Sequence, residues 1–270
     1  MPLTDFQRLL LAELAQAPTD DRYLAGGAAM HFAANSVRYS DDLDFFHDSE
    51  VRVAAAFAAD RDRLLGAGYA VEVALSQPGF IRAVVRRGEQ ATRVDWAHDT
   101  AWRFMPLLRD PLGGLMLHPV DLAINKLLAL AGREEPRDFV DILFVHRRVL
   151  PLAAACWAAV GKDPGFTPLS LLELLKRRGR YRPEDFARLN LVEPFDLAAG
   201  KTVWLAALAD AEAFARGRPP EEIGCLYYAT RQKQAFVMPR PDASLPEQNI
   251  VPHYGAPGGV LPRIADAASP

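Results

Sequence analysis

The sequence is short of several features that define common protein classes. Only two of its 270 residues are cysteines, and Cys156 and Cys225 lie too far apart for a zinc motif or a disulfide framework. No apolar run reaches the length of a membrane span, and the N-terminus has no basic segment followed by an apolar run. We therefore expect a protein of the reducing cytoplasm that has no membrane partner.

Excess positive charge is also missing. The chain has 31 Lys and Arg residues against 34 Asp and Glu residues, a formal net charge of -3, so the chain as a whole is not a basic nucleic-acid binder. Half of the residues are hydrophobic, which is enough to build a sizeable core. This length predicts two lobes.

The most informative stretch joins a glycine pair to two aspartates. A short apolar segment ends at Gly26 and Gly27, and Asp42-Leu43-Asp44 begins a second apolar segment. Glycines at a strand-to-helix turn let backbone N–H groups approach a phosphate. Asp42 and Asp44 share one face of a strand, where carboxylate oxygens suit Mg²⁺. The combination predicts a metal-dependent nucleotide site, although a glycine pair alone is more often a plain turn and Asp-x-Asp alone is more often a solvated loop.

A third carboxylate lies in the middle of a predicted strand. Alternation over residues 91–97 predicts that Asp95 and Arg93 share one face of this strand. A carboxylate in a buried strand needs a partner, because an uncompensated buried charge is costly. Two interpretations stay open: an ion pair with Arg93 or Arg82, and a third metal ligand that also orients an attacking hydroxyl.

Two predicted helices after residue 113 carry a polar set inside apolar sequence. Its members are Lys126, Arg133, Arg137, Asp138 and Asp141. An ion-pair network that holds the two helices together explains this set. A role for Lys126 and an arginine in neutralising a triphosphate explains it as well.

A basic segment follows at residues 176–182. Its charged members are Lys176, Arg177, Arg178, Arg180 and Arg182. With Tyr181 among them, this composition suits a phosphate backbone with one stacked base, and we expect an RNA acceptor here. A solvated helix end has the same composition.

Together, these motifs resemble the AbiEii/AbiGii nucleotidyltransferase toxin family of the polymerase-β-like nucleotidyltransferase superfamily. The resemblance covers about residues 20–145 and rests on the order and spacing of the motifs. The matching elements are Gly26-Gly27, Arg38-x-Ser40-x-Asp42-Leu43-Asp44-Phe45, the strand residue Asp95, Lys126, and Arg133-x-x-x-Arg137-Asp138-x-x-Asp141.

The resemblance implies an α+β nucleotidyltransferase fold, in which a small mixed sheet flanked by helices precedes a helical lobe. We expect a nucleotidyltransferase core with the metal carboxylates at residues 1–112 and the helical lobe at residues 113–218. Residues 219–270 are expected to form a hairpin, with strands at residues 224–228 and 234–238, and a tail rich in proline and glycine.

The resemblance also implies roles for individual residues. Mg²⁺, or Mn²⁺ in its place, would be held by Asp42, Asp44 and Asp95, and these three carboxylates with Lys126 would be catalytic. The residues implied in NTP binding are Gly26, Gly27, Arg38, Ser40, Lys126, Arg133, Arg137 and Asp138. The implied acceptor is an RNA such as the 3′ end of tRNA, and a cognate antitoxin protein is the implied partner.

One departure from the family pattern concerns the phosphate turn. Many relatives have Ser or Thr after the first glycine, whereas this chain has Gly27 and Ala28, so Ser40 is the candidate source of a hydroxyl. Three alternatives stay open. They are transfer to a small-molecule hydroxyl, as in antibiotic-modifying enzymes, a catalytically inactive module that keeps the fold, and a glycosyltransferase that uses Asp-x-Asp.

Overall fold

The computed structural model describes residues 3–16, 22–32, 36–112, 114–231 and 234–263. The chain forms two compact units, each discontinuous in sequence. Unit 1 comprises Met1–Ala101, Pro106–Leu122 and Asn190–Pro194, and unit 2 comprises Trp102–Met105, Ala123–Leu189 and Phe195–Pro270. The metal carboxylates expected from the sequence therefore belong to unit 1, and the polar set around Lys126 belongs to unit 2.

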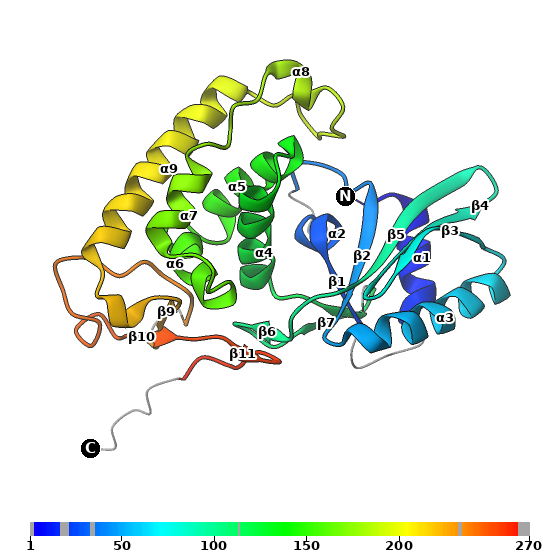
Figure 1. Cartoon of the computed structure of the whole chain (residues 1–270), viewed down its shortest axis with the longest axis horizontal. Coiled ribbons are helices and arrows are strands. Elements are labelled where there is room, and N and C mark those ends of the chain that lie inside the picture. Colours follow the sequence, from blue (N-terminus) through cyan, green and yellow to red (C-terminus); the bar gives the residue numbers. More distant parts are fainter. Residues whose placement is uncertain (1–2, 17–21, 33–35, 113, 232–233, 264–270) are drawn as a thin grey trace. The chain divides into compact units, whose positions relative to one another are not determined.

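Unit 1 is built on a seven-stranded sheet with the strand order β3-β4-β5-β2-β1-β8-β7 (Figure 1). The strands are β1 (Arg22–Ala25), β2 (Asp42–His47), β3 (Ala70–Gln77), β4 (Phe80–Arg87), β5 (Gln90–His98), β7 (Leu108–Asp110) and β8 (Gly114–Met116). The pairs β2–β5 and β1–β8 are parallel and the other pairs are antiparallel. The sheet is therefore mixed, which confirms the expected α+β class.

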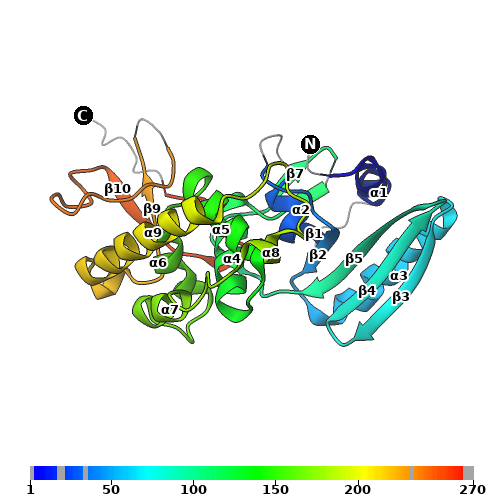
Figure 2. The ribbon, with the colours of Figure 1, turned by 90° about the horizontal axis from the view of Figure 1, so that it is seen from above.

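Three helices accompany this sheet: α1 (Asp5–Ala15), α2 (Gly26–Met30) and α3 (Glu50–Gly66). Thr4 begins α1 with a capping box, because its side chain accepts from the Gln7 N–H while the Gln7 side chain accepts from the Thr4 N–H. Helix α3 runs along β3, β4 and β5 (Figure 2). Its Asp60 accepts a hydrogen bond of 2.8 Å from the Trp96 indole of β5.

One face of the sheet is apolar because strand residues alternate. Leu43 and Phe45 of β2 and Val94 and Trp96 of β5 are all buried, and the Phe45 and Trp96 rings stack with centroids 6.4 Å apart. Both α1 and α3 contact β5. The residues between these apolar positions point to the opposite face, so the sequence pattern assigns the charged residues of β2 and β5 to that second face.

Unit 2 is mainly helical. Its helices are α4 (Pro119–Gly132), which begins in unit 1, α5 (Pro136–Arg148), α6 (Leu152–Lys162), α7 (Pro168–Leu175), α8 (Pro183–Phe186) and α9 (Leu197–Gly217). Helices α6, α7 and α9 pack against one another (Figure 1). The buried Phe139 ring of α5 makes an edge contact with Trp204 of α9 at 5.5 Å, which joins these helices around an aromatic core.

The expected hairpin after residue 219 is formed in part, through an antiparallel bridge between Tyr228 and Phe236. The Ala229 N–H donates to the Ala235 main-chain oxygen and the Val237 N–H donates to the Tyr227 main-chain oxygen, each at 2.9 Å. Strand β9 (Leu226–Ala229), which follows the 3₁₀ turn Pro220–Glu222, also pairs with β10 (Ile250–His253), a pairing that the sequence did not predict. Burial favours both pairings, because Ile250 belongs to a cluster with Trp157, Cys225 and Tyr227, and Val237 packs against the same cluster. The remaining pair joins β6 (Trp102–Arg103) to β11 (Ala256–Pro257).

The structure also bears on the missing membrane spans and on the two cysteines. In the part of the chain that the structure describes, no helix is both long and apolar enough to cross a membrane. Cys156 and Cys225 are free and buried, and burial raises the pKa of both thiols, that of Cys225 to about 11. A raised thiol pKa disfavours the reactive thiolate, so neither cysteine suits nucleophilic chemistry.

Candidate active site

The glycine pair allows side chains of neighbouring segments to approach the main chain after β1. Gly26 has φ +59, which favours glycine, and a Cβ there would lie 1.8 Å from Oδ2 of Asp44. Ala25 pairs with Asp44 across the antiparallel β1 and β2 strands. Gly26 is therefore required both by its backbone conformation and by the carboxylate that occupies the space of a side chain.

Gly27 makes room for two other predicted site residues. A Cβ at this position would lie 2.9 Å from Nη2 of Arg38 and 2.9 Å from Oγ of Ser40. The Ser40 hydroxyl donates to the Asp42 main-chain oxygen at 3.0 Å and lies 3.3 Å from its carboxylate. Ser40 thus brings a hydroxyl next to Gly27, the position at which the family resemblance led us to expect Ser or Thr.

The three predicted metal carboxylates lie on one face of the sheet in unit 1. Asp42 and Asp44 are two residues apart on β2, and the parallel register places Asp44 opposite Asp95 and Asp42 opposite Arg93. Opposite residues of neighbouring strands point to the same face. This face is the one turned away from the apolar layer, and both Asp42 and Asp95 are nonetheless buried.

Arginines neutralise two of these carboxylates. Arg82 of β4 donates from Nε and Nη2 to the two carboxylate oxygens of Asp95, at 2.8 Å and 2.6 Å, and Arg93 forms an ion pair with Asp42. Hydrogen bonding to Asp95 raises the pKa of Arg82, with added attraction from Asp42 and Asp44 and against the opposing effect of burial. The ion pair between Asp95 and Arg82, one of the two interpretations left open by the sequence, is therefore present.

The three carboxylates suit a hard cation in their chemistry, but Asp42 and Asp95 are already paired with arginines. Three carboxylates at neighbouring positions of one face match the oxygen ligands that Mg²⁺ and Mn²⁺ prefer. Among the residues that the structure describes, however, no three His, Cys, Asp or Glu side chains form a group that could hold a metal ion. The role of Asp42, Asp44 and Asp95 as metal ligands stays a prediction.

Unit 2 contains the ion-pair network that was one reading of the polar set. Lys126 Nζ of α4 lies 3.2 Å from Oδ1 of Asp138 and 2.8 Å from Oδ2 of Asp141, both on α5. Arg133 Nε lies 2.6 Å from Oδ2 of Asp138. Arg137 follows Pro136 at the start of α5. The network joins α4 to α5, and roles for Lys126, Arg133, Arg137 and Asp138 in NTP binding stay predictions.

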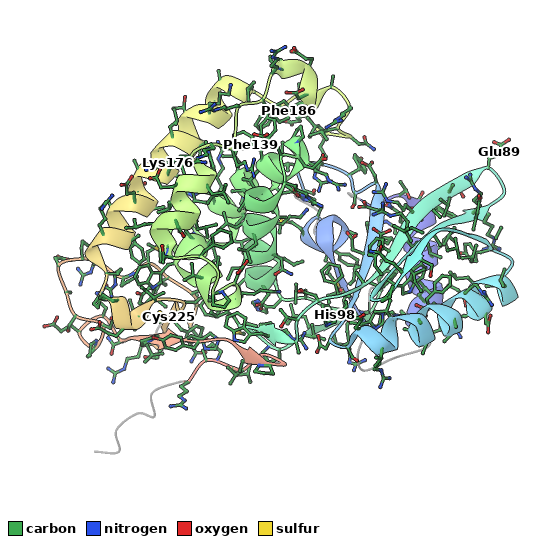
Figure 3. The ribbon with its side chains drawn as sticks, in the orientation of Figure 1. Glu89, His98, Phe139, Lys176, Phe186 and Cys225 are labelled. Carbon is green, nitrogen blue, oxygen red and sulfur yellow. The ribbon has the colours of Figure 1, made fainter. Side chains whose placement is uncertain are left out.

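The basic segment divides into anchored and exposed residues. Lys176 Nζ, labelled in Figure 3, lies 2.7 Å from Glu173 and 2.8 Å from Glu212. Arg178 donates at 2.6 Å to the Ala131 main-chain oxygen. The other three members, Arg177, Arg180 and Arg182, are exposed, as is Lys176 despite its two ion pairs. These three are better placed than the anchored pair to contact a polyanion.

The expectation that Tyr181 stacks on a base is wrong. Tyr181 is only 6 % exposed, and its ring lies 5.4 Å from that of Phe139 and 5.7 Å from that of Phe186, both labelled in Figure 3. Burial raises the pKa of the Tyr181 phenol to about 12. The side chain belongs to the aromatic core of unit 2, where a base has no access to its ring face.

Sequence reasoning missed one residue that supports the site. Gln7 of α1 donates from Nε2 to the Ser40 main-chain oxygen at 2.9 Å and lies 3.3 Å from the Thr92 hydroxyl. Gln7 is buried, so these contacts tie α1 to the segment that carries Ser40. Nothing in the local sequence around Gln7 indicates this contact, because its partners are distant along the chain.

Comparison with known proteins gives the family and the fold of the chain. The family model described as nucleotidyl transferase AbiEii toxin, type IV toxin–antitoxin system, matches residues 8–220. A candidate nucleotidyltransferase from Helicobacter pylori is similar in fold, with 15 % identity and a TM-score of 0.52 over 79 % of this chain and 96 % of that chain. MenT4, a nucleotidyltransferase toxin from Mycobacterium tuberculosis, has 19 % identity and a TM-score of 0.53 over 80 % of this chain and 83 % of that chain.

No curated protein sequence matches the chain. The two structural similarities are too low in identity to show more than the fold. The family model, in contrast, spans well over half of the sequence and contains every motif on which the resemblance rests. The chain therefore belongs to the AbiEii family of nucleotidyltransferase toxins.

Proposed function

We propose that this nucleotidyltransferase moves a nucleoside monophosphate from an NTP to a hydroxyl group of RNA, with the 3′ end of tRNA as acceptor. The reaction depends on Mg²⁺ or Mn²⁺, and the protein acts as the toxin of a toxin–antitoxin pair. The observation that carries this proposal is the convergence of Asp42, Asp44 and Asp95 on one sheet face beside the Gly26–Gly27 turn.

The proposed reaction is an in-line displacement. The acceptor oxygen attacks the α-phosphorus, the bond to the β-phosphate oxygen breaks, and pyrophosphate leaves. Asp95 orients the acceptor hydroxyl and accepts its proton. When bound, the divalent cation held by Asp42, Asp44 and Asp95 neutralises charge on the phosphates.

The phosphates also need contacts from the protein. In unit 1, the main-chain N–H groups at Gly26 and Gly27 and the hydroxyl of Ser40 are proposed to bind phosphate oxygens, and the buried Arg38 beside Gly27 is proposed to position them. Contacts of the NTP with Lys126, Arg133, Arg137 and Asp138 of unit 2 are implied by the family resemblance and stay predictions, because Lys126 and Arg133 are paired with Asp138.

An RNA acceptor is supported by the exposed part of the basic segment. Arg177, Arg180 and Arg182 present three charges within six residues, which suits successive backbone phosphates. The cognate antitoxin is proposed because the family is described as part of a toxin–antitoxin system. Expression of the chain alone should arrest growth, and co-expression of a small protein encoded by the neighbouring gene should restore it.

The decisive experiment incubates the full-length protein with each α-labelled NTP and total tRNA, with Mg²⁺ or with a chelator. We expect label on tRNA with Mg²⁺ only, and none with the Asp44→Asn variant. Label that appears on a small hydroxyl compound and never on tRNA would overturn the RNA acceptor while keeping the chemistry. Equal labelling of tRNA by the wild type and the variant would overturn the assigned site.

A further inference from the structure

Two arginines form ion pairs with two of the proposed metal carboxylates. Arg82 holds both oxygens of Asp95, and Arg93 holds Asp42. The registers place Arg82 opposite Asp95 and Arg93 opposite Asp42, so all four side chains lie on the polar face of unit 1. Asp42 and Asp95 thus have counter-ions within the protein.

This pairing has a clear electrostatic reason. Asp42 and Asp95 are buried, and Asp44 lies opposite Asp95 and two residues from Asp42 on β2, so three carboxylates without counter-ions would repel one another. Arg82 relieves this repulsion by donating from Nε and Nη2 to the two carboxylate oxygens of Asp95. The guanidinium groups of Arg82 and Arg93 therefore supply the positive charge that a metal ion would otherwise supply to Asp95 and Asp42.

The two arginines differ from permanently buried partners in their exposure. Their side chains are 37 % and 36 % exposed for Arg82 and Arg93, whereas those of Asp95 and Asp42 are 6 % and 9 % exposed. A long side chain with its head partly in water can leave its partner without crossing a packed layer. The carboxylates, in contrast, are held by the strands that carry them.

We infer that Arg82 and Arg93 are built-in counter-ions that a divalent cation must displace from Asp95 and Asp42, so that these arginines set the affinity for the cation. This inference rests on the proposed metal-dependent function. It also accounts for the observation that no metal-binding group of three side chains exists among the described residues while both ion pairs are in place.

Mn²⁺ binding to the full-length protein tests the inference without measuring turnover. Free Mn²⁺ is followed by electron paramagnetic resonance as it is titrated into the wild type, Arg82→Gln and Arg93→Gln. Each substitution removes the competing charge, so we expect Mn²⁺ to bind roughly tenfold more tightly, the lower end of the effect of an adjacent arginine on the proton affinity of a carboxylate. Asp44→Asn in each background should abolish this binding and so identify the site.

Arg86→Gln is the matched control. Arg86 lies on the same strand and, four residues from Arg82, on the same face, and its exposed side chain faces Ala91 in the register. The variant loses the same charge without releasing Asp95. Its Mn²⁺ affinity should stay within about twofold of the wild type, because charges separated in solvent are strongly screened.

Thermal unfolding supplies a second readout. Without metal, Arg82→Gln and Arg93→Gln should melt below the wild type, because each leaves a buried carboxylate unpaired, and Mn²⁺ should raise their melting temperatures by more than it raises that of the wild type. If a glutamine variant folds only with Mn²⁺, that result supports the inference. If it folds under neither condition, Arg82→Lys replaces it, and loss of the two-pronged hydrogen bond should then tighten Mn²⁺ binding by a smaller factor.

Two negative outcomes are distinguishable. Wild-type protein that binds Mn²⁺ through Asp44, together with arginine variants of equal or weaker affinity, overturns the counter-ion role and leaves the proposed function intact. Absence of Asp44-dependent Mn²⁺ binding in the wild type and in every variant overturns the inference together with the metal part of the proposed function.

Discussion

The two units each contain a cluster of carboxylates and cations, and the clusters differ in exposure. In unit 2, Asp138 and Asp141 are 0 % exposed and the side chain of their shared partner Lys126 is 8 % exposed. In unit 1, the aspartates are also buried, but Arg82 and Arg93 have more than a third of their side chains in contact with solvent. The contacts of Lys126 with Asp138 and Asp141 therefore form a closed cluster, although Arg133, the second partner of Asp138, is 49 % exposed. The cluster in unit 1 is open, because both of its cations reach solvent.

This difference separates a structural role from a chemical one. Breaking a closed network leaves a buried charge without a partner, so such a network holds helices together. An open cluster can exchange its cation for another one and so can take part in binding. Charged residues in apolar segments of this chain thus have two roles: some hold helices together, and others are available for binding. The following substitutions test whether the open cluster carries chemistry and the closed one stability.

The largest effect is expected for Asp44→Asn. The change removes a charge at nearly constant volume, so nucleotide transfer should fall by at least about 10³-fold while the protein stays folded. Transfer to tRNA and circular dichroism are measured on the same sample. Glu89→Gln in the exposed β4–β5 turn, labelled in Figure 3, is the control and should leave both unchanged. Unchanged transfer by Asp44→Asn with Mg²⁺ present would remove the open cluster from the site.

Asp95→Asn should distinguish a catalytic role of Asp95 from a role limited to its ion pair with Arg82. If Asp95 orients the acceptor hydroxyl, transfer slows by roughly two orders of magnitude or more while NTP affinity is nearly kept. Single-turnover rates and NTP binding are compared with the melting temperature. A lower melting temperature with full activity per folded molecule would instead reduce Asp95 to a partner of Arg82.

Asp141→Asn should act on stability. It leaves Lys126 with less compensation in a closed network, and we expect a loss of about 3 to 5 kcal/mol in the free energy of unfolding, measured by urea titration. Glu184→Gln is the control, because Glu184 lies 4.0 Å from Arg182 in an exposed pair worth under about 1 kcal/mol. A fall in transfer per folded molecule, without loss of stability, would show that the closed cluster also carries chemistry.

The smallest effect is expected at the basic segment. If the segment contacts RNA, replacing Arg177, Arg180 and Arg182 by alanine should reduce the slope of log affinity for tRNA against log salt by up to about 3 units. The slope falls because binding releases fewer counterions when fewer phosphates are neutralised. Binding of NTP should stay unchanged. A triple alanine variant of the exposed Arg147, Arg148 and Arg231 is matched in charge and should keep the slope. Equal slopes in both variants would exclude the segment from the acceptor site.

The sequence by itself determined the local features of this protein. Period-two alternation assigned Asp42 and Asp44 to one face and separated Asp95 and Arg93 from the buried Val94 and Trp96, because side-chain direction along a strand depends only on position. Motif order and spacing identified the family, which the matched residues 8–220 confirm. The glycine pair indicated a backbone turn, and Gly26 does have a positive φ.

Only the tertiary structure decided which distant segments meet. The pairing of β2 with β5 brings Asp44 opposite Asp95, and the pairing of β4 with β5 gives Asp95 to Arg82 rather than to Arg93. The same holds for Ser40 beside Gly27 and for Tyr181 in an aromatic core. Such contacts depend on register and burial between segments far apart in the chain, and local periodicity carries no information about either.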